Sequence, residues 1–301
     1  MGIIRVGTCS WTDPTMARAW YPVKVRTPAG RLRFYAQHFD TVEVDSTFYA
    51  LPSARNATLW AQRTPAGFTF HIKAFGLITR HSIPEGRLPP SLRHQFPYQL
   101  TRYGNVKNPP QDMITEVFRL FREGIEPLRL AGKLGLILLQ FPPYFTAEDQ
   151  GTRRRNAAWI VRCRRELADY RLAVEFRHRS WVEGSTRQWV LDFLRDHHCT
   201  FVCVDQPALP ARNVLPRLTV ATAEVAYVRF HGRNRSSWNR RTESAAERFK
   251  YLYTEEELRE WVPALRALAS QTRETFVMFN NCFGDYAPRN ALQMRLLLEA
   301  D

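Results

Sequence analysis

The sequence predicts one α/β domain over residues 1–301, a single (β/α)8 barrel of the TIM type. Eight short apolar runs are spread along the chain, most of them end in a polar or charged residue, and helical patterns separate them. Strands that alternate with helices favour a parallel sheet, and eight in this order favour closure into a barrel. The runs are Ile3–Gly7, Thr41–Val44, Phe68–Ala74, Leu134–Phe141, Leu172–Phe176, Phe201–Val204, Val225–Phe230 and Thr275–Phe279.

The segments between the runs have apolar residues at helical spacing. A helix over Arg31–Phe39 follows the first run, and Ser53 is placed as the N-cap of a helix that ends near Gly67. Further helical patterns cover approximately Asp112–Ala131, Arg153–Ala168, Ser185–His197, Thr254–Ser270 and Ala287–Glu299. Thr254 and Glu257 have the form of a capping box. An open doubly wound sheet is the alternative, but no glycine-rich dinucleotide loop follows the first run.

Two connections are longer than ordinary loops. The first runs from His81 to about Gln111, is rich in proline and follows the third strand; the second runs from Gly232 to about Tyr253 and follows the seventh. Both lie on the C-terminal side of their strands, where barrel enzymes bind substrate, so we expect both to overhang a site. The sequence contains no internal repeat and no Gly/Ser linker, which favours a single domain.

Composition excludes several classes of protein. Of the 301 residues 45% are hydrophobic, which is enough for a sizeable core and too many for a disordered chain. No uninterrupted apolar stretch is long enough to span a membrane, and the N-terminus lacks the plan of a secretory signal. The five cysteines are odd in number and scattered, which argues against a secreted disulfide framework. We therefore expect a cytoplasmic protein with no membrane partner.

The net charge of +14 indicates anionic partners, either a small molecule or nucleic acid. Arginine greatly outnumbers lysine, so codon bias is a compositional alternative for this charge. Nothing in the sequence addresses the oligomeric state.

Polar side chains at or just after the strand ends are candidates for an active site. They are Thr8, Asp45, Lys73, Gln140, Glu175, Arg177, Asp205, His231, Asn280 and Asn281. Residues two apart on a strand share a face, so Glu43 shares a face with Asp45, His71 with Lys73, Glu175 with Arg177, and Arg229 with His231. Several strands thus bring charge into the barrel, where an unpaired ion would cost several kcal/mol.

The mechanism that these residues favour is general acid–base chemistry on a phosphorylated or otherwise anionic small molecule, by a hydrolase, lyase or isomerase. Glu175 or Asp45 would be the base and His231 the proton shuttle, while Lys73, Arg177 and Arg229 would bind the anion. The catalytic candidates are Lys73, Glu175, His231 and Asp45. Candidate binding residues are Thr8, Trp11, Glu43, Tyr49, His71, Gln140, Arg177, Trp181, Asp205, Arg229, Arg233, Asn280 and Asn281. A purely structural ion network is the alternative.

Two other mechanisms are weaker. A Schiff base on Lys73 needs a lowered pKa, which Arg177 or Arg229 nearby would favour, while Glu175 and Asp45 would stabilise the ammonium by up to ~4 kcal/mol at contact. The sequence requires no cofactor. The candidate ligands for a divalent metal are Glu43, Asp45, Glu175, Asp205 and His231. The strand ends, however, lack the several histidines that are typical of barrel metallohydrolases.

The segment after the seventh strand, residues 233–250, is basic. Arg233, Arg235, Arg240, Arg241, Arg248 and Lys250 face only Glu243 and Glu247, with Trp238 among them. The loops after strands seven and eight of barrels frequently bind phosphate, and basic residues interleaved with an aromatic also bind single-stranded nucleic acid. A nucleic-acid-binding or processing protein and a non-catalytic ligand-binding barrel therefore remain alternatives to the enzyme.

Several motifs in order resemble one family. They include Gly7-Thr8-Cys9-Ser10-Trp11, Thr41-Val42-Glu43-Val44-Asp45-Ser46-Thr47-Phe48-Tyr49, Leu138-Leu139-Gln140-Phe141-Pro142-Pro143 and Ala173-Val174-Glu175-Phe176-Arg177-His178-Arg179-Ser180-Trp181. Across nearly its whole length the chain is similar to the YecE-like family, domain of unknown function 72. The resemblance implies a TIM-type barrel and names no activity. The chain departs from the usual pattern at Cys9-Ser10, where Ser-Gly is typical, and in its longer loop after the third strand.

Overall fold

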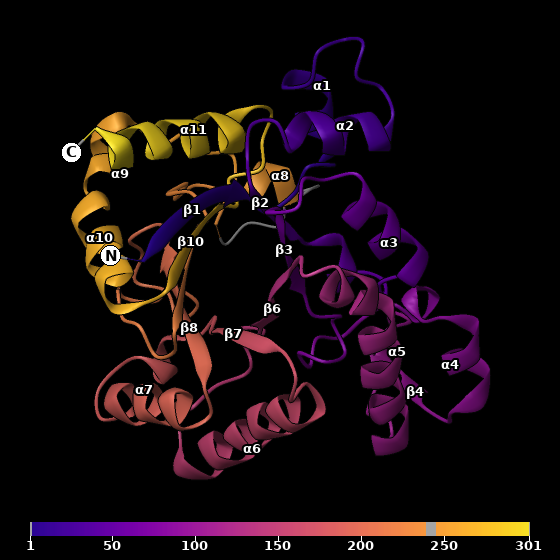
Figure 1. The fold of residues 1–301 in the computed structure, drawn as a ribbon. Helices are drawn as coiled ribbons and strands as arrows, with labels where there is room; N and C mark the ends of the chain where they lie inside the picture. Colours follow the sequence, from indigo (N-terminus) through magenta and orange to yellow (C-terminus); the bar gives the residue numbers. More distant parts are fainter. Residues whose placement is uncertain (1, 239–244, 301) are drawn as a thin grey trace.

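The computed structural model, which describes residues 2–238 and 245–300, contains a closed barrel of eight parallel strands in the order β1-β2-β3-β6-β7-β8-β9-β10 (Figure 1). The predicted fold class is therefore confirmed. The barrel strands are β1 Ile3–Thr8, β2 Thr41–Val44, β3 Thr69–Lys73, β6 Leu134–Gln140, β7 Arg171–Glu175, β8 Cys199–Asp205, β9 Val225–Phe230 and β10 Glu274–Phe279.

Helices cover the outside of the barrel, and most of them coincide with the predicted patterns. They are α1 Pro14–Ala19, α2 Pro28–Tyr35, α3 Ala54–Gln62, α5 Gln111–Leu130, α6 Gln150–Glu166, α7 Thr186–Asp196, α9 Glu255–Arg259, α10 Val262–Gln271 and α11 Tyr286–Glu299. Helix α2 begins three residues earlier than expected because the Thr27 hydroxyl caps the Gly30 amide and Pro28 fits the first helical turn. The sequence pattern did not indicate α1, which Asp13 caps.

The helix expected over Thr254–Ser270 is two helices, α9 and α10. The capping box at Thr254 and Glu257 is present at the start of α9. Pro263 lies in the first turn of α10. Because proline donates no backbone hydrogen bond and its ring clashes with the carbonyl four residues earlier, it is tolerated best in the first turn of a helix, which is its position in α10.

The long connection after β3 has structure of its own. It contains a 3₁₀ helix η2 at Glu85–Arg87, helix α4 at Pro90–Gln95, and an antiparallel hairpin of β4 Gln99–Leu100 with β5 Val106–Lys107. These elements lie at the periphery beside α5 (Figure 1). Helix α8, Ala245–Arg248, belongs to the connection after β9.

The predicted alternation of side chains decides which residues enter the barrel. On β3, Phe70 and Ile72 pack outward, and His71 reaches across the interior to the ring of Phe276 on β10, 4.2 Å between ring centres. The direction of the β9 side chains was ambiguous from sequence. The structure turns Tyr227 and Arg229 inward, because both bind Glu43 of β2 on the other side of the barrel.

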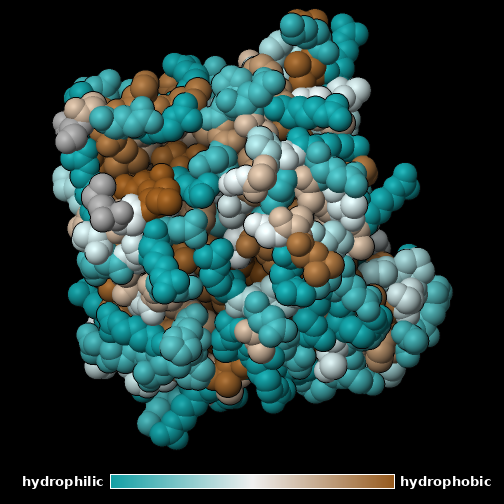
Figure 2. All heavy atoms as spheres, viewed as in Figure 1, coloured by the Kyte–Doolittle hydropathy of each residue, from teal (hydrophilic) through white to brown (hydrophobic). Residues whose placement is uncertain are grey.

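The surface in the view of Figure 2 is mostly hydrophilic, with an apolar area beside the N-terminus. Exposed apolar side chains of the first strand and last helix include Ile3 and Leu296. Within the described residues, no helix combines the length and apolar character needed to cross a membrane.

Helix α5 packs on the segment before α3 through Gly124. A Cβ atom added at Gly124 would lie 2.2 Å from the backbone oxygen of Pro52, which cannot move aside as a side chain does. We expect Gly124→Ala to lower the free energy of unfolding by about 1–3 kcal/mol in urea denaturation, although alanine favours a helix. The matched control is Gly67→Ala, where an added Cβ meets nothing within 4 Å. Equal stability of the two variants would contradict close packing here.

Candidate active site

A cavity of about 340 Å³ lies at the C-terminal ends of the strands. Its charged lining residues come from five different segments of the chain, and they are Asp13, Asp45, Lys73, Arg177 and Arg248. Aromatic side chains form much of the remaining wall, namely Phe48, Tyr49, Phe141 and Phe249 together with His81. Gln140, Asn280 and Cys282 add polar groups. The cavity therefore combines charged groups with aromatic walls.

A buried ion network lies beneath the cavity. Arg229, only 1% exposed, donates from Nη2 to Glu43 Oε1 at 2.7 Å and from Nη1 to Glu175 Oε2 at 2.6 Å. Tyr227 donates a further hydrogen bond to Glu43 at 2.9 Å. Burial lowers the pKa of Arg229, but Glu43 and Glu175 outweigh it and raise that pKa well above its ordinary value. Arg229 is thus a permanent cation that joins β2, β7 and β9.

Glu175 is surrounded by hydrogen-bond donors. Besides Arg229, its carboxylate accepts from Gln140 Nε2 at 2.8 Å, Arg177 Nη1 at 3.0 Å and His231 Nε2 at 3.0 Å. Burial raises the pKa of Glu175, but Arg229, His231 and Arg177 outweigh this effect and hold the pKa well below its ordinary value. Glu175 is therefore ionised and fully engaged.

His231 is held at both ring nitrogens. Its Nε2 lies 3.0 Å from Glu175 Oε1 and 3.2 Å from Arg177 Nη1, and its Nδ1 lies 2.9 Å from the Asn280 amide nitrogen. The ring of Phe249 stacks on it at 5.8 Å. Burial lowers the pKa of His231 to about 4 although Glu175 favours the charged form. His231 is consequently neutral at pH 7.

Arg177 connects the network to the cavity. Its side chain is 14% exposed, and its guanidinium lies 5.2 Å from the ring of Trp238 in the connection after β9. Burial lowers the pKa of Arg177 and Glu175 opposes that change. One part of this guanidinium binds Glu175, and the side chain also lines the cavity.

Lys73 and Asp45 face the cavity as half-buried charges. Lys73 Nζ lies 4.5 Å from the centre of the Phe48 ring. Burial lowers the pKa of Lys73 and Arg229 lowers it further, while Glu43, Asp45 and Glu175 raise it; the net direction is downward. Burial raises the pKa of Asp45 to about 6, and Lys73 opposes that rise. In the described part of the chain no hydrogen bond reaches the Asp45 carboxylate.

Of the predicted site residues, the structure thus brings ten to this region. Those that line the cavity are Asp45, Tyr49, Lys73, Gln140, Arg177 and Asn280. Glu43, Glu175, Arg229 and His231 form the network directly beneath it. Lys73, Glu175 and His231 therefore lie in the same region, as expected, but in two layers. Lys73 lines the cavity, and Glu175 and His231 lie in the network beneath it.

His71 lies deeper, in the barrel interior. Its Nε2 contacts Thr41 Oγ1 at 3.0 Å, and Nδ1 accepts from the Leu136 amide at 3.0 Å. Burial lowers the pKa of His71 well below its ordinary value. A neutral histidine satisfied at both nitrogens and fully buried is a core residue, and the structure does not place it at the cavity.

Three other predicted binding residues pack against other parts of the structure and do not line the cavity. Thr8 hydrogen-bonds the hydroxyl of Tyr35 on α2 at 2.9 Å. Trp11 packs edge-on against Trp60 of α3, 5.5 Å between ring centres. Trp181 is fully buried and stacks on aromatic neighbours. Position at a strand end did not distinguish these outward-facing side chains from inward-facing ones.

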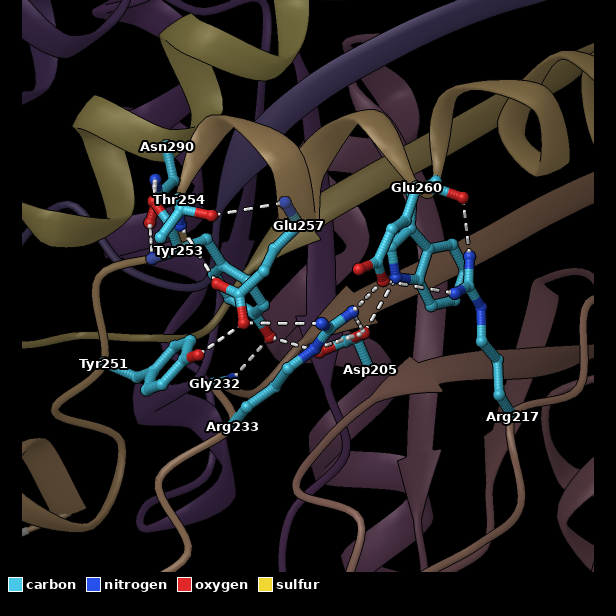
Figure 3. Close-up of polar contacts among 11 residues, drawn as sticks. Asp205, Arg217, Gly232, Arg233, Tyr251, Tyr253, Thr254, Glu257, Glu260 and Asn290 are labelled. Carbon is cyan, nitrogen blue, oxygen red and sulfur yellow. Dashed lines mark hydrogen bonds and ion pairs between the residues drawn. The ribbon is translucent and has the colours of Figure 1, made fainter.

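Asp205 and Arg233 belong to a separate polar cluster beside α9 and α10 (Figure 3). Asp205 accepts from Arg233, from the Tyr253 hydroxyl at 2.7 Å and from Trp261 Nε1 at 2.7 Å. Arg233 also donates to Glu260 at 3.0 Å. The charge of Arg233 is thus neutralised locally, so this arginine adds nothing to a basic surface.

The structure also places Asn281, after β10, and part of the basic segment 233–250, after β9. The Asn281 amide donates to the Tyr251 carbonyl and to Asn290, each at 2.9 Å, and so ties the chain after β10 to α11. Arg248 reaches the cavity, and Lys250 Nζ lies 4.3 Å from the ring of Phe283. Arg240, Arg241 and Glu243 lie outside the described residues.

Several lining residues were missed at the level of sequence. Asp13, His81 and Phe249 come from connections, where no strand period indicates a direction. Cys282 follows Asn280 by two residues, and this spacing was the only feature of the sequence that could have placed Cys282 at the cavity with Asn280. Across the residues that the structure describes, no three His, Cys, Asp or Glu side chains gather in a way that could hold a metal ion.

Comparisons with known proteins agree with this architecture. The model of a family described as "Protein of unknown function DUF72" matches residues 5–301. The chain is 30% identical over 302 residues to the UPF0759 protein YunF of Bacillus subtilis strain 168, covering 99% of this chain and 96% of YunF. A DUF72 family crystal structure from Thermotoga maritima MSB8 superposes with a TM-score of 0.76 at 32% identity, covering 99% of each chain. One from Enterococcus faecalis V583 gives 0.78 at 25% identity, covering 99% and 96%.

Proposed function

The chain belongs to the DUF72 family of proteins of unknown function, and from this premise we propose that it is an enzyme that performs general acid–base chemistry on an anionic small molecule at the barrel mouth. The observation that carries this proposal is the position of Asp45 and Lys73, a carboxyl and an amine with opposed pKa shifts, on one cavity wall. Groups whose environments move their pKa values toward neutrality are typical of acid–base sites.

The charges of the cavity support an anionic substrate. Lys73, Arg177 and Arg248 are three cationic lining residues against two carboxylates, Asp13 and Asp45. Arg177 has further N–H groups beyond the one that binds Glu175, and its planar fork suits a carboxylate or phosphate. An anion between these cations would replace the water that they otherwise need.

Asp45 is the strongest candidate for the acid–base group. A pKa of about 6 lies close to the working pH, where a carboxyl both accepts and donates protons efficiently. Glu175 accepts from four donors and its pKa is held low, so it is a poor base. His231 is neutral with both nitrogens engaged. We therefore assign Glu175 and His231 to positioning Arg177.

Arg229, like Glu175 and His231, is assigned a supporting role in place of the direct role expected from the sequence. From sequence it was a candidate to bind the anion, but its N–H groups bind Glu43, Glu175 and Cys9. Because Arg229 is only 1% exposed, a substrate in the cavity has no access to it. Arg229 supports the site by holding Glu43 and Glu175 in place, and Arg177 and Arg248 are left to bind the anion.

Anion binding is the direct test of this proposal. We expect inorganic pyrophosphate to bind in isothermal titration calorimetry at low salt, and Arg177→Met to weaken that binding by about 10–100-fold, the value of one or two charge-assisted hydrogen bonds. Arg248→Met gives a second measurement, because Arg248 is exposed and its loss does not threaten the fold. The control is Arg154→Met, an exposed position on α6.

The result that contradicts the proposal is absence of saturable binding, or equal weakening by the Arg154 control. Binding of single-stranded DNA instead of pyrophosphate, with steep salt dependence, would favour the nucleic-acid alternative. A tight ligand that is never converted would favour a binding barrel.

A further inference from the structure

Lys73 differs from the other buried lysine of the chain. Lys133 Nζ donates three hydrogen bonds to oxygens of Ala61 and Thr64, at 2.6, 2.6 and 3.0 Å. That arrangement satisfies an ammonium and nothing else. Lys73 Nζ has no hydrogen bond or ion pair to any residue of 2–238 or 245–300, and its contact is with the face of the Phe48 ring. The Lys73 amine is thus left open to whatever occupies the cavity.

The residue type at this position is itself informative. Of the 43 basic residues in the chain only five are lysines, and the other cations at or beneath the cavity are arginines: Arg177, Arg229 and Arg248. Arginine stays protonated in every protein environment, whereas a buried lysine loses its proton readily and becomes a nucleophile. A cation needed only for its charge would be served by arginine.

Three carboxylates raise the pKa of Lys73, those of Glu43, Asp45 and Glu175, and two of them, Glu43 and Glu175, have other partners. Glu43 is bound by Arg229 and Tyr227, and Glu175 by Arg229 and Arg177. Their charges are therefore largely spent on partners other than Lys73. Burial and the neighbouring Arg229 lower the pKa of Lys73, so the reactive neutral amine is more abundant than in a solvated lysine.

We infer that Lys73 forms a Schiff base with a small carbonyl compound that carries a carboxylate or phosphate group, bound in this cavity. The inference rests on the proposed function, since Arg177 and Arg248 hold the anionic group and Asp45 moves the proton. The Phe48 ring, which now faces the ammonium, would face the iminium cation in the same way.

The chemistry needs no oxidant, reductant or cofactor. Lys73 Nζ adds to the carbonyl carbon, a C–N bond forms, and a proton from the nitrogen passes to the former carbonyl oxygen to give a carbinolamine. Protonated Asp45 then gives its proton to this hydroxyl, the C–O bond breaks, and water leaves. The products are the iminium of Lys73, the Asp45 carboxylate and one water. The carboxylate remains beside the cation that it helped to form.

Borohydride trapping tests the inference. The full chain is incubated with pyruvate in one arm and glycolaldehyde phosphate in the other, reduced with sodium borohydride, and mapped by peptide mass spectrometry. We expect an adduct on Lys73 that exceeds the adduct on exposed Lys24 by about tenfold or more, because the bound carbonyl is held beside the amine. A larger yield of the Lys73 adduct with pyruvate indicates that the site prefers a carboxylate, and a larger yield with glycolaldehyde phosphate indicates that it prefers a phosphate.

Matched variants separate this inference from the proposed function. Lys73→Arg cannot form an imine, so it should give no adduct at position 73, while Lys24→Arg, at an exposed position outside the cavity, should trap as the wild type does. An adduct spread evenly over the lysines, or none on Lys73 in a protein that binds pyrophosphate, overturns the Schiff base and leaves the anion site standing. Absence of pyrophosphate binding to the wild type instead overturns the proposed function.

Discussion

Arg229→Met is expected to lower the free energy of unfolding by about 3–5 kcal/mol, the cost of leaving buried carboxylates without their partner. Arg229 is 1% exposed, and its guanidinium lies between Glu43 and Glu175, which have no exposed surface. Methionine fills a similar length but supplies no charge. Glu43 would keep only the hydrogen bond from Tyr227, and Glu175 would lose the shorter of its two arginine contacts, so the buried negative charge would be incompletely neutralised. The midpoint of urea denaturation measures the effect.

Two further variants make this expectation specific to the buried charges. Adding Glu43→Gln and Glu175→Gln to Arg229→Met should recover part of the lost stability, because neutral amides cost less to bury than unpaired carboxylates. The control is Arg119→Met on α5, where a network with Glu116 and Glu123 is exposed to solvent. We expect that control to stay within experimental error of the wild type. A loss at position 229 no larger than at 119 would contradict the network's structural role.

Asp45→Asn is expected to stabilise the folded protein above pH 6 and to reduce turnover. The pKa of Asp45 is raised from 3.8 to about 6 in the folded state. Between these two values the folded protein binds more protons than the unfolded chain, so its stability falls as pH rises through that window. At about 1.4 kcal/mol per pKa unit the ionised carboxylate costs up to about 3 kcal/mol at pH 7–8. Asparagine removes that cost.

The measurement is the melting temperature of both proteins from pH 4 to pH 8. We expect the curves to approach each other near pH 4 and the variant to melt a few degrees higher at pH 8. Asp192→Asn, at an exposed site on α7, should show no such divergence. On the first anionic compound that the wild type converts, Asp45→Asn should lower kcat/KM by about 10²–10⁴-fold. A variant that is less stable at pH 8, or fully active, would contradict the assigned role of Asp45.

Most of the fold could be read from the chain because each element carries a local signal. Strand β6, Leu134–Gln140, is an apolar run whose last residue is polar, and the capping box at Thr254 and Glu257 marks the start of α9. Where two local signals conflict, the pattern was insufficient. Apolar spacing continued through Pro263, but a new helix begins there, with Pro263 in the first turn of α10.

The candidate site could be predicted only in part. The period of two along a strand correctly grouped Glu43 with Asp45 and Arg229 with His231, because side chains alternate in every strand. The same rule does not say which of the two faces is inside. For that reason Thr8 was expected at the rim and instead packs against α2.

The amino-acid sequence by itself determined the eight strands, their alternation with helices, the family, and the strand ends that carry charge. These follow from periodicity and from local backbone preferences, which act over a few residues. Only the tertiary structure decided which charges neutralise one another: Arg229 with Glu43 and Glu175, and Arg233 with Asp205. Pairing across a barrel depends on distances between residues up to 186 positions apart, and those distances exist only once the strands have closed. Lys73 and Asp45 are the candidates at the cavity because they line it and take no part in these ion pairs.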